Sequence, residues 1–228
     1  MNSVNQAVYV PGTQVYQFGT NKGPNLPITG APADTNWRRW SMLHDGKIYR
    51  MYFFKGSTNN TLYQFGWDGS SYKYGHESEP ELTVTGIPED ADTSSFSMVY
   101  GEGEYRLYFR QLGNPTCLYQ FLWDETAGHY APFSNPESFK LQVSGFPDDT
   151  DWSRWSMLND GENYRIYAFK LGSNNEIYQG AWNGSEYEYG YNGSYKVLYL
   201  KDTPANSDLA SMAMLHDSSD YRLYVQTL

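Results

Sequence analysis

The sequence predicts an all-β fold in which a repeated unit closes into a ring. Aromatic residues make up 18% of the 228 residues, and short apolar runs alternate with glycine- and proline-bearing turns, which is typical of many short strands. A tyrosine-arginine pair returns four times at nearly constant spacing. The two ends of the chain also carry complementary parts of one unit, and a closed ring accounts for this.

The tyrosine-arginine pair marks the four units. It lies at Tyr49-Arg50, Tyr105-Arg106, Tyr164-Arg165 and Tyr221-Arg222, with spacings of 56, 59 and 57 residues. A period of this size indicates a supersecondary unit copied around a ring or along a solenoid. Because the repeat covers nearly the whole chain, we expect residues 1–228 to form one domain of four repeats, each of about 47 to 59 residues.

Each unit contains two hairpins. In the first unit they turn at Asp45-Gly46 and at Asp68-Gly69, and Asp-Gly between two apolar runs is a strong hairpin signal. A short extended piece and a proline-bearing acidic turn follow. Eleven residues separate the glycine that ends this piece from a serine on the next strand, as in Gly30 and Ser41. We therefore expect four strands per unit and a connection of fixed geometry.

The chain ends predict ring closure. The last residues, YRLYVQTL, form the second strand of a unit, and residues 8–18, VYVPGTQVYQF, supply its third strand. A solenoid would instead carry capping repeats at both ends. The pattern predicts a four-bladed β-propeller of four-stranded antiparallel blades, closed by pairing of the N- and C-terminal strands.

A four-bladed ring of this size resembles the hemopexin-type propellers in architecture, over essentially the whole chain. Repeats of that family open each blade with Asp-Ala, whereas the similar pair Asp90-Ala91 occurs here in one repeat and lies inside an acidic turn. The resemblance therefore implies the fold alone. It implies neither the central ion sites nor the haem binding of that family.

Charge and cysteine content exclude several classes of function. The formal net charge is −10 and no lysine or arginine block is present, so we expect no nucleic-acid partner. The single cysteine, Cys117, leaves no intramolecular disulfide and no cysteine-based zinc site. No run is long enough to span a bilayer, and no signal peptide precedes the first strand. We expect a cytoplasmic protein without a cofactor, with leaderless export as the alternative.

An arginine column recurs on the second strand. Its members are Arg50, Arg106, Arg165 and Arg222. They stand among apolar and aromatic residues, where a guanidinium group needs an anionic or carbonyl partner. We expect clamps between blades, made to the acidic turns that bear Asp34, Asp90, Asp149 and Asn206. The alternative is a ring of guanidinium groups in an axial tunnel that receives an anion.

A glutamine column is assigned to the third strand. It comprises Gln17, Gln64, Gln120 and Gln179. Because buried amides are nearly always satisfied, we expect these side chains to bond the backbone of the neighbouring blade. The alternative is that they line the axial tunnel.

The acidic turns carry carboxylate or amide pairs two residues apart. They are Asp34/Asn36, Asp90/Asp92, Asp149/Asp151 and Asn206/Asp208. Oxygen ligands at this spacing can contribute to a calcium site. Aspartate and asparagine also bond their own backbone in turns, and we favour this second interpretation.

Two tryptophans and two histidines are further candidates. Trp37 and Trp152 align with Thr93 and Leu209 in the other units, so they can lie exposed at one rim and stack on sugars or anchor a protein partner. Ordinary packing under a loop is the alternative. His44 and His216 share one column and are weak candidates for a transition-metal site, whereas a hairpin tip is the simpler explanation.

The sequence therefore favours a non-enzymatic binding module, because no catalytic signature stands beside the repeat. We expect lectin-like carbohydrate recognition at the propeller rim. The rim residues are Trp37, Trp152, Asp34, Asp92, Asp151 and Asp208. One alternative is a propeller that binds another protein, and a second is a small-ligand or metal carrier that uses the axial tunnel.

Overall fold

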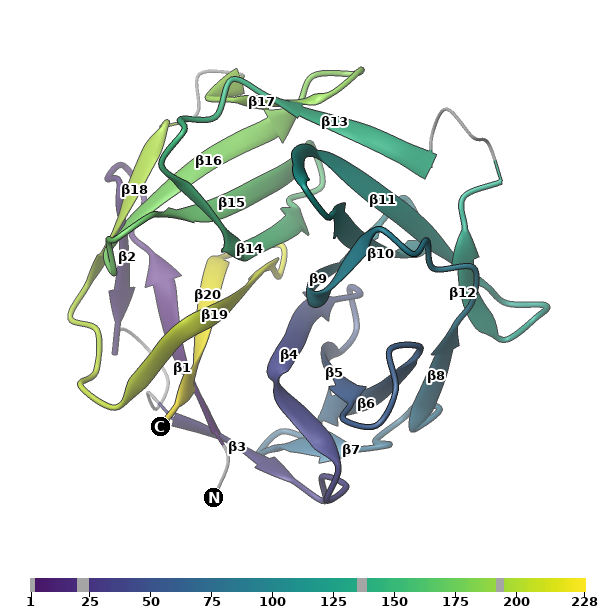
Figure 1. Ribbon diagram of the computed structural model, residues 1–228. Coiled ribbons are helices and arrows are strands. Elements are labelled where there is room, and N and C mark those ends of the chain that lie inside the picture. Colours follow the sequence, from purple (N-terminus) through teal and green to yellow (C-terminus); the bar gives the residue numbers. More distant parts are fainter. Residues whose placement is uncertain (1–2, 20–24, 135–138, 192–194) are drawn as a thin grey trace.

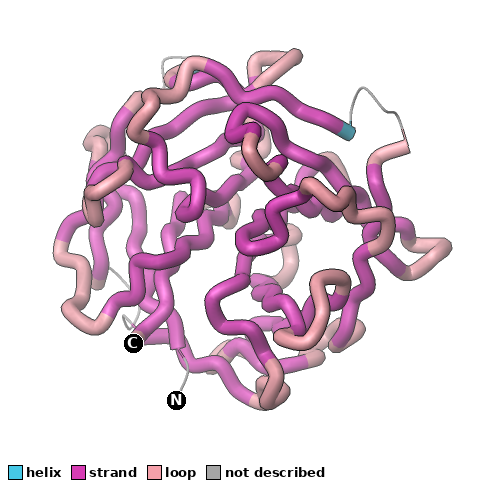
Figure 2. The backbone as a smooth tube through the Cα atoms, viewed as in Figure 1, coloured by secondary structure: helices cyan, strands magenta, loops and turns pink. Residues whose placement is uncertain are grey.

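The strands of the computed structural model form a propeller-like ring (Figure 1). The structure describes residues 3–19, 25–134, 139–191 and 195–228. Nearly all of this chain is strand or turn (Figure 2), and the described strands belong to one continuous sheet. The prediction of an all-β fold is confirmed. Within the described ranges, no helix has the length and apolarity that a membrane crossing requires.

Four inner strands surround the centre of the ring. They are β4 (Thr35–His44), β9 (Ala91–Gly101), β14 (Thr150–Asn159) and β19 (Ser207–His216). Each contacts the next one, and β19 contacts β4, so the contacts run in a closed cycle (Figure 1). The serine that follows a glycine by eleven residues lies on three of these strands, as Ser41 on β4, Ser97 on β9 and Ser156 on β14.

Three serine hydroxyls join neighbouring inner strands. The buried hydroxyls of Ser41, Ser97 and Ser156 accept hydrogen bonds from backbone N–H groups on the following strand. The donors are Met98, Met157 and Met214, at 2.8, 2.8 and 2.9 Å respectively. Ala213 holds the corresponding position on β19, opposite Tyr224 as Ser41 is opposite Tyr52.

Two further strands pair antiparallel outside each inner strand. The second strands are β5 (Tyr49–Lys55), β10 (Glu104–Gln111), β15 (Tyr164–Lys170) and β20 (Tyr221–Thr227). The third strands are β6 (Thr61–Trp67), β11 (Asn114–Asp124), β16 (Glu176–Trp182) and β1 (Ser3–Tyr9). The hairpins turn where the sequence predicts: Gly46 and Gly69 have φ of 84° and 96°, a left-handed conformation that glycine adopts without strain.

The first and last strands of the chain close the ring. β1 pairs antiparallel with β20, from Val4 opposite Gln226 to Val8 opposite Arg222, so the predicted pairing of the chain ends is confirmed. The predicted third strand was placed too far along the chain, because residues 3–9 form it. Residues 15–18 form the next strand outward, β2 (Val15–Phe18).

The outermost layer of each unit consists of two short strands instead of the one expected. The first half of this outer layer is, in the four units, β7 (Tyr72–Tyr74), β12 (His129–Pro132), β17 (Tyr187–Tyr189) and β2. The second halves are β8 (Glu81–Val84), β13 (Lys140–Ser144), β18 (Val197–Lys201) and β3 (Asn25–Thr29). In the first unit Gly75, with φ of 67°, and Pro80 lie between the halves, and both residue types interrupt a strand.

The second halves connect neighbouring units. β8 pairs antiparallel with β6 of its own unit and parallel with β12 of the next. The same parallel link joins β13 to β17, β18 to β2 and β3 to β7. These links cover strand edges that would otherwise be free to pair with another molecule.

The hydrophobic core is divided among the junctions between units. One cluster joins Tyr52 and Phe54 of the first unit to Phe96, Leu107 and Phe109 of the second. Corresponding clusters fill the other junctions of the described chain. Each unit is thus a layer with core on both faces, and the junctions are where side chains of two units meet.

The serine bonds lead to a first prediction. Ser97 is 0% exposed, so Ser97→Ala leaves the Met157 N–H buried without an acceptor, and we expect the free energy of unfolding to fall by about 1–3 kcal/mol. Urea unfolding measures this. Ser185→Ala, which removes an exposed hydroxyl, is the control and should change stability by less than about 0.5 kcal/mol. Equal losses in both variants would contradict the role of Ser97.

Candidate functional site

The tyrosine-arginine pair lies at the junctions between units. In the first unit Arg50 Nε donates to Asp45 Oδ2 at 2.7 Å. Tyr105 of the second unit donates its hydroxyl to the same oxygen at 2.8 Å, and the Arg50 guanidinium lies 6.0 Å from the Tyr105 ring centroid. One carboxylate therefore holds an arginine of its own unit and a tyrosine of the next.

The third and fourth units repeat this arrangement. Arg165 donates to Asp160 at 2.5 Å and Tyr221 donates to it at 2.8 Å. Asp217 pairs with Arg222 at 2.5 Å and accepts the Tyr49 hydroxyl at 2.6 Å. Because Tyr49 belongs to the first unit, the clamp also operates where the chain ends meet.

The second unit departs from the pattern, because Gly101 stands where the other units have the aspartate. A Cβ there would lie 2.1 Å from Asn159 Nδ2 and 2.5 Å from the Tyr164 hydroxyl. Two glutamates serve instead: Arg106 Nη2 donates to Glu102 Oε2 at 2.6 Å and to Glu104 Oε2 at 2.9 Å.

The sequence suggested that the arginines pair with the acidic turns across the junction between units, and their ion pairs differ from this. The arginines bind carboxylates of their own first hairpin, and the tyrosines cross the junction. The aspartates of the acidic turns accept tyrosine hydroxyls of the third strands instead. The pairs are Asp34 with Tyr63 at 2.6 Å, Asp90 with Tyr119 at 2.7 Å and Asp149 with Tyr178 at 2.8 Å.

Hydrogen bonds govern the ionisation of the clamp carboxylates. Burial alone raises the pKa of Asp45, but the Ile48 N–H, the Arg50 guanidinium and the Tyr105 hydroxyl outweigh it and hold the pKa below its ordinary value. The pKa values of Asp160 and Asp217 are lowered in the same way. Burial and the bond to Asp45 in turn raise the pKa of Tyr105 to about 12.

Three pockets in the described chain open beside these clamps. Each is lined by an arginine and a glutamine of one unit and by a tryptophan and two tyrosines of the next. Their volumes are about 150, 390 and 250 Å³. The recurring residues are Arg50, Gln64, Tyr105, Trp123 and Tyr130 in the first pocket; Arg106, Gln120, Tyr164, Trp182 and Tyr187 in the second; Arg222, Gln6, Tyr49, Trp67 and Tyr72 in the third.

The fourth junction has tyrosine in the place of tryptophan. Tyr9 pairs with Tyr16 on β1 and β2, as Trp67 pairs with Tyr72 on β6 and β7. Its ring lies 5.4 Å from that of Tyr16 and 6.0 Å from that of Tyr221. Arg165 and Gln179 hold the arginine and glutamine positions of this junction.

The glutamine column contains Gln6, and its assignment to Gln17 was wrong. Gln6 lies opposite Tyr224, as Gln64 lies opposite Tyr52. Gln17 is on β2, where its Nε2 donates to Asp202 at 3.1 Å.

Intramolecular bonds fix the orientation of two of the glutamine amides. Gln120 Oε1 accepts the Tyr108 hydroxyl at 2.9 Å, and Gln64 Nε2 donates to the Glu79 carbonyl at 3.0 Å. Both partners belong to the glutamine's own unit, so the expected backbone partner in the neighbouring unit was wrong.

The pocket tryptophans were not among the residues selected from the sequence. Trp67, Trp123 and Trp182 each follow the column glutamine by three residues, and each lies half-buried at the end of its strand. This constant spacing of three residues is the sequence signal that identifies the pocket tryptophans. Aligning the third strands instead of the tryptophan-rich inner strands would have found it.

The tryptophans that were selected pack against neighbouring side chains. Trp37 is half-buried with its ring 4.9 Å from that of Phe53, and Trp152 contacts Phe146 at 5.0 Å and the Arg110 guanidinium at 5.5 Å. Neither lines a described junction pocket. This is the packing alternative raised from the sequence.

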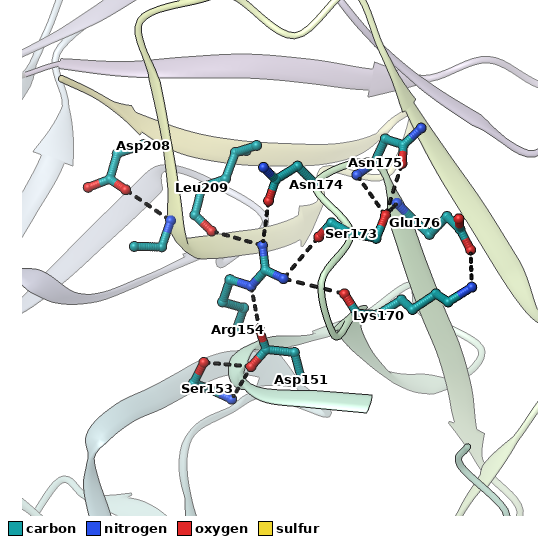
Figure 3. Close-up of polar contacts among 11 residues, drawn as sticks. Asp151, Ser153, Arg154, Lys170, Ser173, Asn174, Asn175, Glu176, Asp208 and Leu209 are labelled. Atoms are coloured by element: carbon teal, nitrogen blue, oxygen red, sulfur yellow. Dashed lines mark hydrogen bonds and ion pairs between the residues drawn. The ribbon is translucent and has the colours of Figure 1, made fainter. Parts of the chain in front are cut away.

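The acidic-turn carboxylates bond nearby groups. The backbone N–H of Ser94 donates to Asp92 at 3.0 Å, and that of Ala210 donates to Asp208 at 2.9 Å. Figure 3 shows Asp151 in a larger network, in which it accepts Arg154 Nε at 2.6 Å while Arg154 also donates to the Ser173 carbonyl at 2.9 Å. The Ser94 and Ala210 contacts are those of turn formation.

The axial cavity is narrow and is lined by both apolar and polar residues. Its volume is about 10 Å³, and its lining includes Met42, Met98, Leu158 and Met214. Three arginines and three glutamines of the two columns line the junction pockets instead, so the tunnel alternative was wrong for these side chains. They are Arg50, Arg106, Arg222, Gln6, Gln64 and Gln120.

The two histidines line the axial cavity. His44 lies 4.5 Å from Tyr49 and His216 lies 4.6 Å from Tyr221, measured between ring centroids. Among the described residues, no group of three His, Cys, Asp or Glu side chains is placed to hold a metal ion.

No protein-family model matches this chain, and neither does any curated protein sequence. Several solved structures resemble it. The fungal lectin of Aleuria aurantia, described as a six-bladed β-propeller with a novel fucose recognition mode, is 16% identical with a TM-score of 0.37, over 82% of this chain and 54% of that one. AofleA from Arthrobotrys oligospora is 13% identical with a TM-score of 0.39, over 92% and 53%.

A third similar structure is SapL1 lectin in complex with α-methyl fucoside, 15% identical with a TM-score of 0.35, over 99% of this chain and 65% of that one. The chain thus spans about half the length of the first two structures. At these TM-scores the likeness is too distant to assign a ligand. These structures give the hemopexin-type resemblance no support.

The clamp leads to a second prediction. The lowered pKa of Asp45 stabilises the fold above the unfolded value of about 3.9, and this contribution is lost as the pH falls through the folded pKa. We expect Asp45→Asn to lower the free energy of unfolding by roughly 1–3 kcal/mol at neutral pH, and the difference from wild type to shrink below about pH 4. Denaturant unfolding across this pH range measures both effects.

Glu102→Gln is the matched control, because the Glu102 side chain is 69% exposed whereas that of Asp45 is 4% exposed. Exposed ion pairs contribute about 0–1 kcal/mol, so this variant should remain close to wild type. A pH-independent difference between Asp45→Asn and wild type would show that the ionised carboxylate is not responsible.

Proposed function

We propose that this protein is a non-enzymatic carbohydrate-binding module and that it holds sugars in the pockets at the junctions between its units. The observation that carries the proposal is the recurrence of one arginine, one glutamine, one tryptophan and two tyrosines in three separate pockets. Packing alone does not require a guanidinium, an amide and an indole to meet at the same place in three separate junctions.

The chemistry of these side chains suits a sugar. An indole offers a flat apolar surface on which the C–H face of a pyranose can lie, while guanidinium and amide N–H groups donate to hydroxyl and ring oxygens. Small-molecule sites combine an apolar wall with a few placed polar groups and have volumes of about 300–1,000 Å³. Pockets of about 150 to 390 Å³ favour one sugar residue, such as a chain end.

The half-buried state of the tryptophans also supports the proposal. Trp182 contacts Tyr187 at 5.2 Å, Trp67 contacts Tyr72 at 5.0 Å and Trp123 contacts Tyr130 at 5.2 Å between ring centroids. One edge of each indole is thereby fixed while the remainder faces the pocket. We therefore place the sugar site at the junctions and not at Trp37 and Trp152.

We further infer that the ring has four blades, each made of one unit. The cyclic contacts of β4, β9, β14 and β19 support this count. The clamps from Arg50 to Tyr105 and from Arg222 to Tyr49 support it as well, because they join consecutive units and the last unit to the first. With one pocket per junction, the chain would bind several sugars at once.

Titration calorimetry tests this proposal after a glycan array has identified a ligand. We expect three to four sugars per chain, one for each junction. Trp67→Ala, Trp123→Ala and Trp182→Ala should each weaken one site by at least about tenfold, because an aromatic hot-spot residue contributes about 2 kcal/mol or more. The apparent stoichiometry should then fall by one.

Trp37→Ala and Trp152→Ala are the controls and should leave the stoichiometry unchanged. A folded protein that binds no glycan would contradict the proposed function. Loss of binding in the controls with retention in the pocket variants would instead return the site to the rim.

A further inference from the structure

The three pockets differ in the charges that line them. Three carboxylates and one guanidinium line the pocket between the second and third units: Glu102, Glu104, Glu162 and Arg106. Arg50 and Glu79 line the pocket between the first two units, and Arg222 is the charged residue of the pocket between the fourth and first. The pocket between the second and third units is therefore the most acidic of the three, and it is also the largest.

The difference follows from Gly101. In the other units the carboxylate that neutralises the arginine is buried: the Asp45 and Asp217 side chains are 4% and 3% exposed. Because Gly101 provides no carboxylate, Arg106 is neutralised by Glu102 and Glu104, whose side chains are 69% and 48% exposed. The negative charge thus faces the space that a ligand would occupy.

Glu162 adds a carboxylate without a partner of its own. It lies in the first hairpin of the third unit, where its backbone N–H donates to Asp160 at 3.0 Å. No Lys, Arg or His of the described ranges forms an ion pair with its exposed side chain. Only one of the three carboxylate charges at this pocket is therefore balanced, by Arg106.

A second feature distinguishes this pocket from a merely acidic surface. Gln120 lines it and is 5% exposed. The Tyr108 hydroxyl holds Gln120 Oε1 at 2.9 Å, whereas no described residue accepts a hydrogen bond from the Gln120 amide nitrogen. An amide donor on a largely buried side chain, in the same pocket as Trp182 and Tyr187, is a feature of a ligand site.

We propose that the pocket between the second and third units selects a sugar that carries a protonated amino group, with Glu104 and Glu162 binding the ammonium. The inference rests on the proposed function, because it concerns one of the same pockets. Trp182 receives the face of the ring, the Gln120 amide and Arg106 donate to sugar oxygens, and the two carboxylates accept charge-assisted hydrogen bonds from the ammonium.

Titration calorimetry at slightly acidic pH tests the selection. The probes are glucosamine and galactosamine, each compared with its N-acetyl form and with glucose or galactose. We expect the amines to bind this pocket about fivefold more tightly than the neutral sugars, which is the size of one partly exposed ion pair. The preference should decrease as salt is added. Trp182→Ala should abolish the site and so identify the pocket.

Glu162→Gln should remove most of the preference while leaving the affinity for neutral sugars unchanged, because its side chain forms no ion pair with a described residue. Glu89→Gln is the control, because it removes the same charge at a distant position. Glu89 is exposed just before β9, whereas Glu102 follows the other end of this strand, roughly 30 Å away. The control should keep the preference.

Two failures are distinguishable. If neutral sugars bind but the amines show no advantage, or if Glu162→Gln keeps the advantage, the ammonium site is overturned and the proposed function stands. If no sugar of either kind binds the folded protein, both proposals are overturned together.

Discussion

The carboxylate shared between an arginine and a tyrosine is the contact on which the ring depends. Asp45 binds Arg50 of its own hairpin and the Tyr105 hydroxyl of the next unit. The arginine neutralises the carboxylate charge within one unit. The tyrosine of the next unit donates a hydrogen bond to the same carboxylate and, being uncharged, adds no second charge to the junction. For a buried carboxylate, these two partners offset the desolvation penalty that would leave a lone charge unstable. The arginine and the tyrosine also line the described pockets, so the contact that holds neighbouring units together also positions polar groups offered to a ligand.

The second unit shows what this arrangement permits. Gly101 leaves room for the Tyr164 hydroxyl, and the carboxylates move to the pocket side of Arg106 as Glu102 and Glu104. The clamp is kept while the electrostatic character of the pocket changes. Repetition of a unit therefore does not impose identical sites, because residues that face the pocket can differ while the tyrosine and the arginine stay.

Much of the architecture could be predicted from the sequence, because the tyrosine-arginine period and the Asp-Gly turns are local signals. The pairing of β1 with β20 followed from which part of a unit each end carries. The sequence did not predict which glutamine of the N-terminal region belongs to the column. Both Gln6 and Gln17 lie near apolar residues, and only the cross-strand partner Tyr224 identifies Gln6 as the column member. The site was missed for a related reason. Trp37 and Trp152 are conspicuous in sequence, but Trp123 reaches its pocket from one unit while Gln64 reaches it from another, and packing between units cannot be read from either segment alone.

The split outer strands have a consequence for how such a chain can change in length. β8 is hydrogen-bonded to β6 on one side and to β12 of the following unit on the other. A single unit excised between one tyrosine-arginine pair and the next is therefore not an independent module, since its outer half-strand is also paired with the neighbouring unit. Duplication or loss of a unit would preserve the pairing only if the exchanged segment carried its outer half-strand with it. Circular permutation inside an exposed hairpin leaves every such pairing intact, so new termini are compatible with this ring at the hairpin tips and not at the boundaries between units.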